Sequence, residues 1–110
     1  YMSDASGVRS EQSSLRDIQD YVWRMNKERG FLLESPEKRM LLLTEEVGEV
    51  AKAVRKLVGM KFDTATSHAN LAEEIADVLI ILSGLASMTD IDLYEALVGK
   101  EAKNKQRRWE

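Results

Sequence analysis

The sequence predicts an all-α fold, a four-helix bundle-like unit, and three observations favour it. Apolar residues recur at helical spacing in four blocks, and no stretch of useful length alternates with the period of a strand. Serine, threonine, proline and glycine stand where helices begin and end. We expect one domain over residues 13–110, preceded by a Ser-rich segment, 1–12, that is a disordered tail or an expression remnant.

The first predicted helix opens at Ser14, and Asp17 three residues later completes a variant of the capping box. It stops near Gly30, because glycine is the usual residue just past a helix end. Its apolar face consists of Leu15, Ile18, Val22 and Met25.

The second helix opens with Ser35 as N-cap and Pro36 at the first helical position, where the missing N–H of proline costs nothing. It should run to about Gly59. A polar stretch, 61–67, separates it from a third helix that ends near Met88.

Thr89 is the predicted N-cap of the fourth helix, with Asp92 three residues later. This helix continues through a basic end towards Arg108, and cations at that end favour the helix dipole.

Composition restricts the possible functions of the 110 residues, of which 44% are hydrophobic and 32% charged. The net charge of −3 favours neither a nucleic-acid polymer nor an acidic membrane as partner. The absence of cysteine excludes disulfides, thiolate nucleophiles and cysteine-ligated metals. The longest apolar stretch, 78–88, is too short for the roughly 20 residues of a membrane span, so a cytoplasmic location is expected.

An internal repeat is the most informative feature of the chain. Residues 43–50, LTEEVGEV, recur 28 positions later as residues 71–78, LAEEIADV, with every acidic position kept acidic. Carboxylates repeated on two packed helices can converge on one point, where they repel one another unless cations lie between them. The repeat therefore predicts a Mg²⁺ site and phosphate chemistry.

Helical geometry places the acids of the two copies equivalently. At about 100° per residue from Leu43, Glu46 falls near 300° and Glu49 near 240°, on a face that they share with Ala53. Glu74 and Asp77 take the same offsets in the second copy, beside Ile81 and Gly84. The expected packing stripes lie on another face and consist of Val47, Val50, Val54, Leu57 and Val58 in one helix and of Leu71, Ile75, Val78, Leu82 and Leu85 in the other.

Any one of these acids alone would be read as part of a solvated face, but the repeat favours a metal site. Oxygen ligands select hard cations, so Mg²⁺ is the expected ion and Mn²⁺ a possible substitute. Glu45 is a candidate general base, whereas Glu73 is expected at the surface or beside a metal-bound water. The predicted ligands are Glu46, Glu49, Glu74 and Asp77.

The one histidine, His68, stands outside the Glu-x-x-His spacing that di-iron bundles require, and is expected to be a loop or capping residue. The basic residues of the last helix have two readings. They can serve the helix dipole and solubility, or they can line a path for phosphates, because they share one face. The candidate substrate-binding residues are Lys100, Lys103, Asn104 and Arg107.

The motifs EEVGE at 45–49 and EIAD at 74–77 resemble the E-E-x-x-E … E-x-x-D signature of the MazG-like all-α nucleoside triphosphate pyrophosphohydrolases. Supporting matches cover most of the chain: Pro36 and Leu42 ahead of the first motif, residues 91–93 and 95–97 at the start of the last helix, and Lys100, Asn104, Arg107 and Trp109 near its end. The resemblance implies that the catalytic acid Glu46 holds Mg²⁺ together with Glu49, Glu74 and Asp77. It also implies that Lys100 and Asn104 contact phosphate, with Lys103 and Arg107 as further candidates. It also implies hydrolysis of ribo- or deoxyribonucleoside triphosphates between the α- and β-phosphates, dimers or tetramers, and often a housecleaning role.

Other questions stay open in the sequence. Trp23, Phe31, Tyr94 and Trp109 can stack on a base or belong to the core. Apolar residues on more than one face of the middle helices favour a homodimer at least. Two alternatives remain: an enzyme like the phosphoribosyl-ATP pyrophosphohydrolases, against which the ending 104–109 argues, and a non-enzymatic metal-binding helical oligomer.

Overall fold

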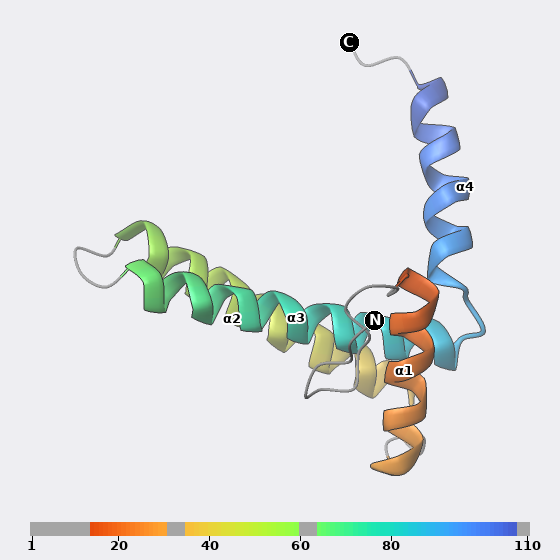
Figure 1. Ribbon diagram of the computed structural model, residues 1–110, viewed down its shortest axis with the longest axis horizontal. Helices are drawn as coiled ribbons and strands as arrows, with labels where there is room; N and C mark the ends of the chain where they lie inside the picture. Colours follow the sequence, from red (N-terminus) through yellow and green to blue (C-terminus); the bar gives the residue numbers. More distant parts are fainter. Residues whose placement is uncertain (1–13, 31–34, 60–63, 108–110) are drawn as a thin grey trace, which may run out of the picture.

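The computed structural model describes residues 14–30, 35–59 and 64–107, and Figure 1 shows how its helices are arranged. No strand occurs in these ranges, which confirms the all-α fold. None of the helices in them is long and apolar enough to cross a membrane. The helices are α1 (Leu15–Glu28), α2 (Pro36–Gly59), α3 (Thr64–Met88) and α4 (Leu93–Gln106).

The starts of α1 and α2 are capped as the sequence predicts. The Ser14 hydroxyl accepts a hydrogen bond from the backbone N–H of Asp17, whose carboxylate accepts one from the backbone N–H of Ser14. This reciprocal pair satisfies two N–H groups that the helix cannot pair internally. The Ser35 hydroxyl similarly accepts from the N–H of Lys38, at 3.2 Å.

Two predicted boundaries are wrong. The third helix begins already at Thr64, so residues 64–67 are helical, while residues 61–63 lie outside the described ranges. Thr89 does not cap α4: its hydroxyl donates to the carbonyl oxygens of Leu85, at 2.8 Å, and Ala86, and so completes the end of α3. Asp92 is the N-cap of α4 instead, since its carboxylate accepts from the N–H of Glu95.

The helices α2 and α3 form a long antiparallel pair, and α1 crosses α3 near the carboxyl end of α3 (Figure 1). The start of α4 packs against α1, and the rest of α4 extends away from the α2–α3 pair. The last helix therefore covers little of the pair within one chain.

The faces by which α2 and α3 pack are shifted from the predicted stripes towards the acids. Ala53 and Ile81, which share a face with the acids, are 2% and 8% exposed. Val47 and Ile75, in the middle of the predicted stripes, are 51% and 53% exposed. The side of each stripe nearer the acids is half-buried, and the far side is exposed. The half-buried members are Val50, Leu57, Leu71, Val78 and Leu85.

A buried polar cluster occupies the seam where α1 covers the pair. Its members, Asn26, Arg39 and Ser83, are 5%, 4% and 0% exposed. A Cβ atom at Gly84 would lie 3.0 Å from the Asn26 side-chain nitrogen and 3.1 Å from the Arg39 guanidinium. Glycine is required there so that these side chains can lie directly against the α3 backbone.

One side chain fixes the start of α4. Buried Gln19 of α1 donates to the Ser87 hydroxyl and, at 2.7 Å, to the Ile91 carbonyl, and it accepts from the N–H of Leu93 at 2.9 Å. Both hydrogen-bonding groups of its amide, the NH₂ and the oxygen, are directed at the α3–α4 connection.

An exposed ion pair reinforces this junction. The Arg16 guanidinium lies 2.9 Å from Asp92 and 3.2 Å from Glu95, and 5.0 Å from the centre of the Tyr94 ring. The hydrogen bond from the Glu95 backbone, followed by that from Arg16, holds the pKa of Asp92 below its usual range. The direction in which α4 leaves the body is thus set by contacts with α1.

Candidate metal centre

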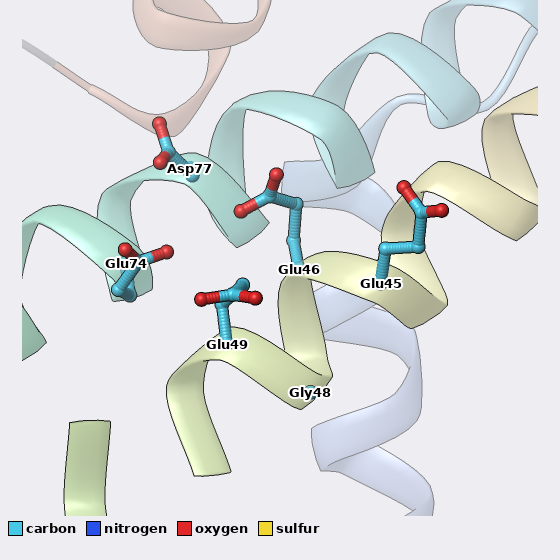
Figure 2. Close-up of a pocket in the computed structure, with 6 residues that line it drawn as sticks. All are labelled: Glu45, Glu46, Gly48, Glu49, Glu74 and Asp77. Carbon is cyan, nitrogen blue, oxygen red and sulfur yellow. The ribbon is translucent and has the colours of Figure 1, made fainter. Parts of the chain in front are cut away.

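The acidic repeat forms one pocket in the middle of the α2–α3 pair, with a volume of about 550 Å³. Figure 2 shows carboxylates from both helices pointing into the same space. The described residues that line it include no lysine or arginine; they are Glu45, Glu46, Gly48, Glu49, Glu74 and Asp77.

Three carboxylates come closest together. Glu46 of α2 and Glu74 and Asp77 of α3 each offer an oxygen, and these oxygens lie within 4.8 Å of one another. That spacing allows one cation to contact all three, so the group can hold a metal ion. The other predicted ligand, Glu49, lines the same pocket outside this closest group.

The electrostatics of the pocket agree with its geometry. Partial burial, and then repulsion from Asp77, Glu74, Glu49 and Glu45, raises the pKa of Glu46 above its ordinary value. Each of these effects disfavours the charged carboxylate, and a bound cation would reverse the electrostatic part.

Glu45 occupies a different place from the other acids. It lies on the far side of Glu46 from Glu74 and Asp77, and its side chain is exposed (Figure 2). From there it can reach the pocket edge rather than its centre. Its candidate role as general base stays a prediction.

The four candidate substrate-binding residues of the last helix do not lie at this pocket within one chain. Lys100, Lys103 and Asn104 lie on α4, and Arg107 is its C-cap. Because α4 extends away from the α2–α3 pair, these residues and the acidic pocket occupy separate parts of the molecule (Figure 1).

The other singled-out residues fall in several environments. Trp23 is half-buried and lines a second pocket with Arg16, Gln19 and Ser87, and Tyr94 is 47% exposed. The helical segment of His68 belongs to α3, but its side chain lies outside the described residues, as do residues 1–12, Phe31, Arg108 and Trp109.

Sequence reasoning missed the residues that organise the fold around the pocket. Gln19 gave no signal, because a lone glutamine in an amphipathic helix resembles a surface residue. Arg39 gave a weak one: it lies seven residues before Glu46, two helical turns away on the same face. Its burial depends on α1, which no pattern in α2 reveals.

The fold and the pocket define an all-α domain whose candidate site is a set of carboxylates shared by two helices. Residues 34–109 match the model of the MazG nucleotide pyrophosphohydrolase domain. The chain belongs to this family.

Curated relatives agree with this assignment. The uncharacterized protein YpjD of Bacillus subtilis is 46% identical over 63 residues, which cover 56% of this chain and 57% of YpjD. Mouse dCTP pyrophosphatase 1 is 34% identical over 89% of this chain and 61% of its own length, and the rat protein is 32% identical over the same shares. The chain thus spans about three-fifths of the length of these relatives.

Proposed function

We propose that this protein is a Mg²⁺-dependent pyrophosphohydrolase that cleaves nucleoside triphosphates between the α- and β-phosphates, giving a nucleoside monophosphate and pyrophosphate. The observation that carries the proposal is the group formed by Glu46, Glu74 and Asp77, whose oxygens lie within 4.8 Å of one another. Membership of the MazG family supports the reaction class. The names of the mouse and rat relatives make dCTP the first substrate to test.

The proposed metal site uses the acids of both repeats. Glu46, Glu74 and Asp77 would hold the ion, with Glu49 as a further ligand, and their all-oxygen character fits Mg²⁺ or Mn²⁺. When bound, such an ion polarises a phosphate and lowers the pKa of a coordinated water.

The remaining chemistry belongs to the side chains of the protein. Glu45, which lines the pocket, would accept a proton from an attacking water and pass it to solvent. Lys100, Lys103, Asn104 and Arg107 would bind the phosphates and offset the charge that develops on the departing pyrophosphate. The reaction requires no cysteine, serine or histidine nucleophile.

We also propose a homodimer or homotetramer as the working state. The support is the exposure of large aliphatic side chains along both long helices, including Leu41 at 70% and Val58 at 78%. Exposed apolar faces of this kind are usually covered by a partner.

The direct test is release of pyrophosphate from ribo- and deoxyribonucleoside triphosphates, with Mg²⁺ and with EDTA. Wild-type protein should release pyrophosphate only with the metal, and Glu46→Gln should not. Phosphoribosyl-ATP belongs in the panel, since cleavage of this compound alone would favour the alternative enzyme class. Metal binding without any hydrolysis would favour a non-enzymatic oligomer.

A further inference from the structure

The direction of the last helix is decided at its start. No residue of α4 is buried, and every residue from 94 to 103 is exposed. The helices α2 and α3, in contrast, pack against each other along their shared length (Figure 1). Since packing along α4 does not orient it, the contacts where the chain leaves α3 and enters α4 must do so.

The connection between the two helices is fixed on the α3 side by a Schellman motif. The backbone N–H of Ile91 donates to the carbonyl oxygen of Ala86 at 2.8 Å, and that of Asp90 donates to the carbonyl oxygen of Ser87 at 3.1 Å. Asp90 has the left-handed φ of 59° that this motif uses. The backbone up to Ile91 is therefore an ordered extension of α3.

The side chain of Gln19 joins this extension to the first residue of α4. Its NH₂ group donates to the Ile91 carbonyl oxygen at 2.7 Å, and its oxygen accepts from the N–H of Leu93 at 2.9 Å. That N–H is one of those that a helix cannot pair internally. Gln19 is 6% exposed, so the amide is largely shielded from water. A side chain that only donates or only accepts cannot make both bonds.

The ion pairs beside this amide are weaker constraints. Arg16 lies 2.9 Å from Asp92 and 3.2 Å from Glu95, but the side chains in these pairs are between 36% and 72% exposed. Water and salt screen exposed pairs, and such pairs hold their long side chains loosely. The buried amide of Gln19 is thus the main constraint on the direction of α4.

A small change at this joint is amplified along the helix. Lys100 and Asn104 follow Leu93 by seven and eleven residues, which is about 10 and 16 Å along the helix axis. Tilting α4 by about 15° at its first residue would move them by about 3 and 4 Å. A hydrogen bond to a phosphate oxygen tolerates only a few tenths of an ångström. The places of these two candidate phosphate-binding side chains therefore depend on the joint.

We propose that Gln19 is a positioning residue for pyrophosphate release: its amide fixes the direction of α4 and thereby places Lys100 and Asn104 at the phosphates of the substrate. Gln19 lies away from the acids, because its partner Ser87 follows Asp77 by ten residues, about 15 Å along α3. It acts through α4 and does not touch the metal or the reacting atoms. The catalytic part of this inference rests on the proposed function, whereas the geometric part does not.

Three substitutions separate the joint from its surroundings. Gln19→Met keeps the length of the side chain but loses its hydrogen bonds to Ile91 and Leu93. Gln19→Glu keeps an acceptor for the N–H of Leu93 but sets a carboxylate against the Ile91 carbonyl oxygen. Ser87→Ala is the matched control, because it removes the third bond of the amide, at 3.0 Å, and leaves the other two in place.

Distances between spin labels measure the direction of α4 without relying on activity. The chain contains no cysteine, so labels can be attached at Lys27→Cys on α1 and Glu101→Cys on α4, both exposed positions. Labelled chains are diluted with unlabelled chains, so that only distances within one chain are recorded. Gln19→Met should broaden the distance distribution or shift its mean by about 3 Å or more, whereas Ser87→Ala should leave it unchanged.

A reference pair of labels monitors the rest of the fold. Lys27→Cys with Lys52→Cys spans α1 and α2, and its distance should be the same in every variant. If this pair shows that Gln19→Met does not fold, Gln19→Glu takes its place in the comparison. An unchanged distance from α1 to α4 in a folded Gln19 variant would overturn the proposal.

Kinetics test the catalytic consequence. Gln19→Met should lower kcat/KM for a nucleoside triphosphate by about 10–100-fold, the scale on which a small misplacement acts. The dissociation constant of Mg²⁺ without substrate should not change, because the acids lie elsewhere. A role in stability alone would lower the melting temperature but leave kcat/KM of the folded protein as in the wild type.

A double-mutant cycle shows whether Gln19 acts through α4. In a Lys100→Ala background, Gln19→Met should lower kcat/KM by much less than it does in the wild type, because one of the groups that it positions is already lost. Full additivity of the two substitutions would contradict the proposal. If the wild type itself releases no pyrophosphate, the proposed function fails, while the spin-label distances still decide whether Gln19 sets the direction of α4.

Discussion

Two polar clusters lie on the same seam between α2 and α3, and they differ in what covers them. Arg39 precedes Glu46 by seven residues on α2, and Gly84 follows Asp77 by seven on α3, so the clusters are about 10 Å apart along the helices. At one end α1 seals the polar side chains to 5% exposure or less. In the middle of the pair the carboxylates line an open pocket.

The difference shows that coverage, and not polarity, separates a site from a structural cluster. The buried groups Asn26, Arg39 and Ser83 are closely packed, because even a Cβ atom added at Gly84 would lie 3.0 Å from Asn26 and 3.1 Å from Arg39. The acids have space in front of them, and each neighbouring carboxylate that acts on Glu46 repels its charge. A polar group in the cluster that α1 covers contributes to packing, whereas a carboxylate in the open pocket is available to bind an ion.

The largest effect is expected from the open cluster. Asp77→Asn should lower pyrophosphate release by roughly 100-fold or more, the scale on which loss of a group that stabilises charge acts. The helical circular dichroism should be unchanged, since Asp77 is exposed. Glu37→Gln, an exposed acid in the first turn of α2, is the control and should stay active.

Added Mg²⁺ should stabilise the folded protein only by binding to the carboxylates of the open acidic pocket. Mg²⁺ at about 100 times its dissociation constant should raise the free energy of unfolding by about 2.7 kcal/mol, because it binds the folded chain alone. Thermal unfolding with and without Mg²⁺ measures this shift. An equal shift in Glu46→Gln would show that the ion binds elsewhere.

The sealed cluster should respond to added volume. Gly84→Ala places a methyl group 3.0 Å from the Asn26 nitrogen, and should lower the free energy of unfolding by about 1–3 kcal/mol. Gly99→Ala is the matched control in α4, where a Cβ atom meets nothing within 4 Å, and helix propensity should make it stabilising by about 0.5–1 kcal/mol. Urea unfolding compares the two; equal effects would mean that the seam at Gly84 is not closely packed.

The smallest effect should be a pH dependence of the metal-free protein. The folded chain binds the Glu46 proton more tightly than the unfolded chain does, because its pKa is raised in the folded state. The free energy of unfolding should therefore fall as pH rises from the ordinary glutamate pKa through the raised value. Glu46→Gln should be more stable than wild type above this window and match it below, as thermal unfolding across pH would show. A constant difference at all pH values would contradict this account.

Local signals in the sequence predicted much of the fold. Ser14 and Ser35 cap their helices and α2 ends at Gly59, because caps and breakers act through neighbouring backbone groups. The prediction for Thr89 was wrong because a threonine at this point can either cap the next helix or bond back to the preceding one. Its hydroxyl donates to a carbonyl oxygen of α3, and only the three-dimensional geometry decides between the two.

The sequence by itself determined the all-α class and the convergence of acids from two helices, since both follow from helical periodicity and an internal repeat. Only the tertiary structure decided which faces are covered: Ala53 and Ile81, beside the acids, are buried, whereas Val47 and Ile75 in the predicted stripes are exposed. It also decided that Gln19 directs α4 away from the acids. Periodicity states which residues share a face, but the partner of each face depends on long-range contacts that no single helix encodes.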